Sequence, residues 1–83
     1  MKIYDFAGNK NICGARVKKA RKNLNISQAT LAARLQVLGV NIERDSVSRI
    51  EIGTRFVADY ELLALSKILG VSSGYLLGDG EEN

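Results

Sequence analysis

Apolar residues recur along this chain with the period of an α-helix, in short segments separated by glycine, serine or asparagine. The first apolar stripe consists of Cys13, Val17, Ala20 and Leu24, which stand at i, i+4, i+7 and i+11. This spacing places all four on one face of a helix at about 11–24. Gly14 slightly weakens its first turn, and Asn25 is a suitable stop. The pattern, with its abundant Leu, Ala, Lys and Arg, favours helices over a sheet.

Four further helices are expected, each with a start or a stop signal. Three candidate N-caps are Ser27, Asp59 and Ser72, whose side-chain oxygens can accept from the free N–H groups of a first turn. The stops are Gly39, Gly53, Gly70 and Gly78, because glycine tolerates the left-handed conformation past a helix end. The residues expected to point inward are Leu31, Ala32, Leu35 and Leu38 in the second helix, Val47 and Ile50 in the third (about 44–52), and Leu62, Leu65 and Leu69 in the fourth. The predicted fold is an all-α, compact five-helix bundle.

The length bounds the organisation. The 83 residues allow one domain, and 46% of them are hydrophobic, which is enough to bury a core. We divide the chain into an N-terminal arm (1–10), a helical domain (11–78) and an acidic tail (79–83). The start is too short and polar for a secretory signal, and no apolar run approaches the roughly 20 residues that span a bilayer. With one cysteine, Cys13, expected in the core, we predict a cytoplasmic protein without a membrane partner.

The residue types argue against most catalytic and metal chemistry. The chain has no histidine and one cysteine, so it lacks a His general base, a Ser-His or Cys-His pair and an imidazole metal ligand. One cysteine is also too few for a zinc site built on thiolates. No pair of acids stands out for carboxylate catalysis. We therefore expect no enzyme, no metal and no cofactor.

The charges are unevenly distributed. Residues 1–55 hold 11 of the 12 Lys and Arg and 4 of the 9 Asp and Glu, a net charge of +7, whereas residues 56–83 carry a net charge of −4. A basic first part followed by an acidic end indicates a surface for a polyanion. A solvated charged surface gives the same asymmetry, so charge alone leaves both interpretations open.

Several motifs in a fixed order resemble those of a known family. They are GARV at 14–17, SQATLA at 27–32, VSRIEIGTR at 47–55, DYEL at 59–62 and LGVS at 69–72. Over about residues 12–78 the chain resembles the phage-repressor and Cro-like helix-turn-helix family, also called the xenobiotic response element family. The resemblance implies a bundle of the lambda-repressor-like DNA-binding type. Its second helix would cross the backbone of double-stranded DNA, and its third would lie in the major groove.

The resemblance also implies roles for individual residues. The base-facing positions are Arg44, Asp45, Ser48 and Arg49, and the phosphate contacts are Gln28, Ser46, Arg55 and Arg21. Independently, the helical period places Asp45, Ser48 and Arg49 on the side of the third helix opposite its inward-facing apolar pair. For the two arginines of this helix, the alternative to DNA contact is a solvated basic face.

Three of these roles have a stated chemistry. Arg49 can donate two hydrogen bonds to O6 and N7 of guanine. Asp45 either accepts from the amino group of cytosine or orients Arg49 one turn further on. Arg21 and Glu51 match a family pair that joins the first helix to the end of the third, and their implied role is a partly buried structural salt bridge.

Two departures from the family pattern concern the third helix. The segment 36–43 is several residues longer than the usual tight turn, and Gln36 stands where glycine is common. We expect the second helix to run about one extra turn, to Leu38, with Val40 and Ile42 closing an extended connection against the core. This affects the start and tilt of the third helix, and Arg44 most of all. In addition, Ile52 projects outward, where it would touch a thymine methyl, a partner protein or nothing.

The function predicted from these observations is a sequence-specific transcriptional regulator, in particular a repressor that reads a two-fold DNA site as a homodimer. The dimer would use Tyr75, Leu76 and Leu77 and the N-terminal arm with Tyr4 and Phe6, or form mainly on DNA. A protein-interaction module is the alternative from another class. An antitoxin-like partner that represses its own operon is a further variant.

Overall fold

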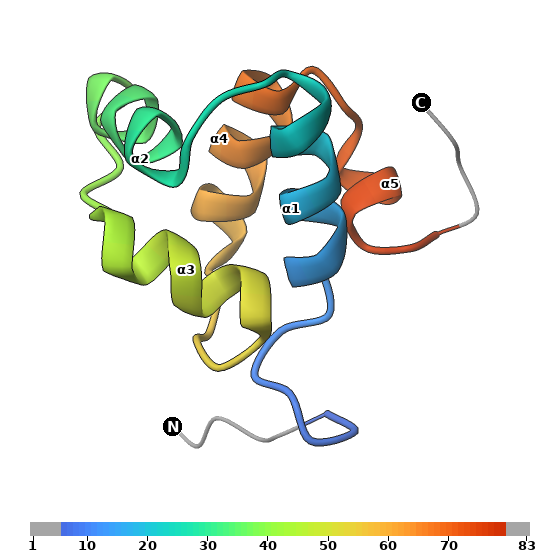
Figure 1. Ribbon diagram of the computed structural model, residues 1–83. Helices are drawn as coiled ribbons and strands as arrows, with labels where there is room; N and C mark the ends of the chain where they lie inside the picture. The colour runs from blue at the N-terminus through green and yellow to red at the C-terminus, as the bar shows by residue number, and fades with distance from the viewer. Residues whose placement is uncertain (1–5, 80–83) are drawn as a thin grey trace.

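The computed structural model describes residues 6–79, and these form five helices joined by short connections (Figure 1). The helices are α1 (Gly14–Asn23), α2 (Gln28–Val37), α3 (Arg44–Ile52), α4 (Asp59–Leu69) and α5 (Ser73–Leu76). Residues 6–79 contain no strand beyond an isolated antiparallel bridge between Phe6 and Asn9. The all-α five-helix prediction is confirmed. The predicted ends of the arm and the tail, including Tyr4, lie outside the described residues.

Serine side chains cap the free N–H groups at the starts of α2 and α5. The Ser27 hydroxyl accepts from the backbone N–H of Thr30 at 3.0 Å, and the Ser72 hydroxyl accepts from that of Tyr75 at 2.9 Å. The prediction that Asp59 caps α4 is wrong, because Ala58 is the N-cap and Asp59 is the first helical residue. The Glu61 carboxylate instead accepts from the Ala58 N–H at 3.0 Å, which is half of a capping box.

The core lies between the five helices, where α1 packs on α3, α4 and α5, and α2 packs on α3 and α4. Its largest fully buried side chains are Leu31, Leu35, Ile42, Ile50, Leu65, Leu76, Val17 and Val47. Cys13 is also buried, as predicted, and burial raises the pKa of its thiol, which therefore stays neutral. For two residues the prediction that they point inward is wrong. Leu24 and Leu38 follow the last turns of α1 and α2, and they are 44% and 51% exposed.

The connection from α2 to α3 is long and packed. Helix α2 ends at Val37, close to the predicted Leu38, and the chain then runs through 38–43 before α3 begins. Val40 and Ile42 turn into the core, as predicted, with 7% and 1% of their surfaces exposed. The Gln36 amide donates to the backbone oxygen of Ile42 at 3.0 Å, which fixes the end of the connection against α2.

Candidate nucleic-acid interface

Helix α3 has one buried face and one exposed face. Val47 and Ile50 are each 1% exposed and anchor the helix in the core. Asp45 and Arg49 are exposed on the other side, as the helical period predicts, and Arg44 is exposed as well. Ser48, which the helical period also placed outward, is half-buried, and so is Ser46. The left-handed conformation of Gly53, with φ of 86°, ends the helix. The polar residues of α3 are therefore presented to solvent on a helix that cannot rotate without exposing its apolar side.

The two arginines of this exposed face differ in their partners. Arg44 donates from Nη2 to Oδ1 of Asp45 at 3.1 Å, and both side chains are exposed. Asp45 thus pairs with its neighbour and does not orient Arg49, contrary to one of the two alternatives. Among residues 6–79, no ion pair or hydrogen bond engages the Arg49 guanidinium. Its five N–H groups are available to an acceptor outside the chain.

The C-terminal end of α3 is joined to α1 by a buried ion pair. Arg21 donates from Nε to Oε2 of Glu51 at 2.6 Å and from Nη2 to Oε1 at 3.0 Å, and its Nη1 donates to the Ile26 carbonyl at 2.9 Å. The side chains of Arg21 and Glu51 are only 10% and 1% exposed. The hydrogen bond to Glu51 outweighs burial and raises the pKa of Arg21. The two charge-assisted hydrogen bonds of this pair fix the axis of α3 relative to α1.

Gln28 is part of the same network. It is the first residue of α2, and its side-chain amide donates to Oε1 of Glu51 at 3.0 Å. One carboxylate therefore ties together the start of α2, the end of α3 and the last turn of α1. The predicted phosphate contact of Gln28 would use its remaining amide hydrogen or its backbone N–H, which lies in the first turn of α2.

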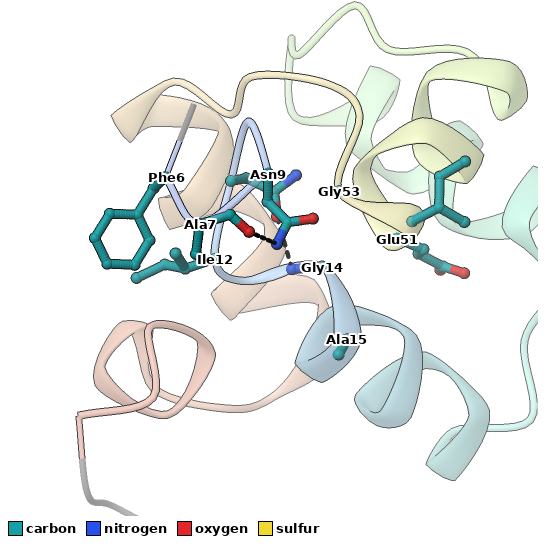
Figure 2. A pocket seen from close by; sticks show the side chains of 10 residues that line it. Phe6, Ala7, Asn9, Ile12, Gly14, Ala15, Glu51 and Gly53 are labelled. Atoms are coloured by element: carbon teal, nitrogen blue, oxygen red, sulfur yellow. Dashed lines mark hydrogen bonds between the residues drawn. The ribbon is translucent and has the colours of Figure 1, made fainter. Parts of the chain in front are cut away.

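Two further residues fix this end of α3, and sequence reasoning missed both. A Cβ atom at Gly14 would overlap the backbone oxygen of Ile50 and lie 2.9 Å from that of Glu51, so α1 and α3 approach as closely as only glycine permits. Figure 2 shows Gly14 beside Glu51 and Gly53. Asn11 donates from Nδ2 to the backbone oxygens of Ile50 and Arg55 at 3.1 and 2.8 Å. The GARV motif was the available signal for Gly14.

Arg55, a predicted phosphate contact, is held by α4. Its Nη1 and Nη2 donate to Oε1 and Oε2 of Glu61 at 2.9 and 3.2 Å, and Nη1 also reaches the Phe56 carbonyl at 2.9 Å. Burial raises the pKa of Glu61, but the hydrogen bonds from Arg55 and the Ala58 N–H outweigh it and lower the pKa overall. A phosphate contact by Arg55 would therefore use the guanidinium N–H groups that do not donate to Glu61.

Several apolar residues outside the core are exposed. Ile52 is 65% exposed at the end of α3 and lines a pocket together with residues of the turn at 6–9. The Lys10 N–H, just after this turn, donates to the Gly53 carbonyl at 2.8 Å. Of the three C-terminal residues suggested for a dimer contact, Tyr75 and Leu76 are unsuitable because they are 6% and 0% exposed, whereas Leu77 is 43% exposed. No helix within residues 6–79 has the length and apolar character needed to cross a membrane.

A short helix packed across a second, with a polar face turned outward and its end tied to α1, defines a helix-turn-helix domain. A family model described as helix-turn-helix matches residues 17–76, and the chain belongs to this family in its phage-repressor-like form. The crystal structure of the P22 c2 repressor protein in complex with synthetic operator 9T is similar, with 33% identity and a TM-score of 0.69. The similarity covers 81% of this chain and 94% of the repressor chain. No curated protein matches the chain.

Proposed function

We propose that this helix-turn-helix regulator is a sequence-specific repressor that inserts α3 into the major groove of double-stranded DNA. The observation that carries the proposal is the exposed guanidinium of Arg49, which has no partner within residues 6–79 and stands close to the end of α3 that a buried ion pair fixes. A rigidly held donor fork is what bidentate recognition of guanine requires. The similarity to a repressor that is bound to its operator supports the same interpretation.

The other residues of α3 and its surroundings divide into base and phosphate contacts. Arg49 reads guanine, and the Arg44–Asp45 pair contacts bases near the start of α3, with Asp45 accepting from cytosine. The two half-buried serines, Ser48 and Ser46, lie at the edges of the groove-facing surface, towards bases and phosphate respectively. Gln28, Arg55 and Arg21 face phosphates with the N–H groups that the internal network leaves free, and they set register rather than sequence.

Two copies of the chain would read a two-fold site, one half-site each, with half-sites about one helical turn apart. A closed two-fold pair is the commonest assembly of such a domain on DNA. The regulator acts without catalysis, metal or cofactor.

Selection of bound sequences from a random duplex library, at two salt concentrations, tests this function. We expect an enriched two-fold motif whose affinity falls steeply with salt, because phosphate contacts release counterions. Arg49→Ala should lose discrimination at one base pair, by about 1–3 kcal/mol. Lys19→Ala, which removes an equal charge from the exposed side of α1, should leave the ranking of sequences unchanged. No enrichment, or a ranking that Arg49→Ala leaves intact, contradicts the proposal.

A protein-interaction module is the second candidate, and the 65% exposure of Ile52 beside the polar face of α3 favours it. This function predicts no steep salt dependence of DNA affinity. In the same selection it would yield no motif at either salt concentration. An antitoxin-like role keeps DNA binding and would add a co-purifying protein partner.

A further inference from the structure

The outer face of α4 carries a mixed apolar and charged surface. Only four residues of this helix are exposed, and they are Asp59, Tyr60, Leu63 and Lys67. The two apolar members are 63% and 51% exposed, and they line a groove of about 320 Å³ together with Leu38 from the end of α2. Val37, one residue earlier, is 85% exposed. Monomeric proteins rarely leave large apolar side chains of this number together on one face.

The charges on this face are placed symmetrically about its centre. Asp59 lies four residues before Leu63, and Lys67 lies four residues after it. At 1.5 Å per residue these two side chains start about 12 Å apart along the axis, so they cannot pair within one helix. Among residues 6–79, neither has an ion-pair or hydrogen-bond partner. The helix face thus offers one acid and one base at equal distances from a central leucine.

We propose that this face is the site at which a second copy of the chain docks, with the two α4 helices antiparallel around a two-fold axis between the Leu63 side chains. An antiparallel arrangement centred there places Asp59 opposite the partner's Lys67, and Lys67 opposite the partner's Asp59. A parallel arrangement would instead oppose like charges. The surface is therefore complementary to itself under two-fold symmetry, as an isologous interface requires.

The apolar side chains complete the contact. Leu63 packs on the partner's Leu63, and each Tyr60 ring extends towards the partner's Leu63 and the methylene stem of the partner's Lys67. Leu38 lines the same groove and enlarges the apolar area. One helix face and one loop make an interface at the low end of the stable size range, so the dimer is reversible.

The proposal deepens the two-fold recognition proposed above by naming the surface through which the copies meet. The proposal rests on that function only where it expects the dimer to form on DNA. Neighbouring half-sites would hold the two copies close together and so raise their effective concentration for each other. The interface itself can be tested without DNA.

Sedimentation equilibrium of the full chain, without DNA, with complementary charge swaps, is the decisive experiment. Asp59→Lys leaves only lysines in the paired positions and Lys67→Asp leaves only aspartates, so each variant alone should associate about tenfold more weakly than the unaltered chain. Mixing the two variants places lysines opposite aspartates in the heterodimer and should restore association. Lys19→Asp, on the exposed side of α1, should associate like the unaltered chain, and melting curves check that each variant is folded.

Three results would overturn the interface: an unaltered chain that stays monomeric up to its solubility limit, single variants that associate as tightly as the unaltered chain, or a mixture that associates no more tightly than the single variants. Leu63→Glu adds an independent check, because it should abolish association in the unaltered chain and in the mixture alike. If a two-fold DNA motif is selected while the swaps have no effect, the repressor function stands and the interface is wrong. If the swaps behave as expected and no motif is selected, the interface stands and the function is wrong.

Discussion

The two ends of α3 are held in place by different means. At the C-terminal end, Gly14 brings α1 into backbone contact, Asn11 donates to two carbonyls, and Glu51 shares a buried ion pair with Arg21. At the N-terminal end, Glu43 is the N-cap but makes no side-chain cap bond. Buried Ile42 and its bond from the Gln36 amide hold the connection there.

This difference divides the exposed face of α3 into two parts. Arg49 stands one turn or less from the densely bonded end, and its guanidinium has no partner in the described part of the chain. Arg44 and Asp45 stand at the lightly held end and are paired with each other. A contact that depends on fixed geometry suits the first part, whereas the second part can shift when the connection changes. The following predictions test whether the two ends are indeed independent.

Removal of the buried acid at the fixed end should have the largest effect. Glu51→Ala leaves the Arg21 guanidinium buried without its carboxylate and frees the Gln28 amide, so we expect a loss of about 3–5 kcal/mol in the free energy of unfolding. Urea denaturation measures it. Glu43→Ala at the other end of the same helix is the matched control and should change stability by less than about 0.5 kcal/mol. Equal effects of the two substitutions would remove the distinction between the ends.

Gly14→Ala should have the next largest effect, at the same end. The added methyl group meets the backbone oxygens of Ile50 and Glu51, which cannot move aside as a flexible side chain can. We expect a loss of about 1–3 kcal/mol, even though alanine favours a helix by about 1 kcal/mol over glycine. Gly74→Ala in α5 is the control, because its Cβ would make only ordinary contacts, at 3.8 Å or more, and should be neutral or stabilising. If the Gly14→Ala protein is as stable as the unaltered chain, the close approach of α1 to α3 is contradicted.

Acid should weaken the link between the segment after α3 and α4. The pKa of Glu61 is lowered, since bonds from Arg55 and the Ala58 N–H outweigh the opposing effect of burial. Its folded pKa therefore lies below its unfolded value, so its contribution is complete above the unfolded value and is lost as pH falls through the folded one. Glu61→Gln should cost about 1 kcal/mol at pH 7 and progressively less towards pH 3, as measured by urea denaturation. A difference that does not shrink in acid would show that the charge of Glu61 is unimportant.

Local sequence patterns predicted the lightly held end better than the fixed one, where only the family resemblance pointed to the Arg21–Glu51 pair. The bounds of α3 and the burial of Val40 and Ile42 follow from local patterns, namely apolar spacing and a terminal glycine. Asn11 and Gly14 act on Ile50 and Arg55, about forty positions away, and no local pattern reveals such a contact. Leu38 was placed inward by extending a helical period past the point where α2 ends. Local rules therefore fix elements, whereas the orientation of α3 depends on long-range contacts.

The smallest effect on stability, and the most specific effect on function, is expected at the start of α3. Gln36→Ala removes the donor to the Ile42 carbonyl, while the buried apolar side chains of the connection remain. The free energy of unfolding should therefore fall by about 1 kcal/mol or less. The start of α3 can then shift. Discrimination among single-base variants of the selected site should relax at the base pairs that Arg44 and Asp45 contact and persist at the one that Arg49 reads. Asn41→Ala, an exposed position in the same connection, should alter neither. If Gln36→Ala instead relaxes every position equally, α3 moves as one rigid unit and its two ends are not independent.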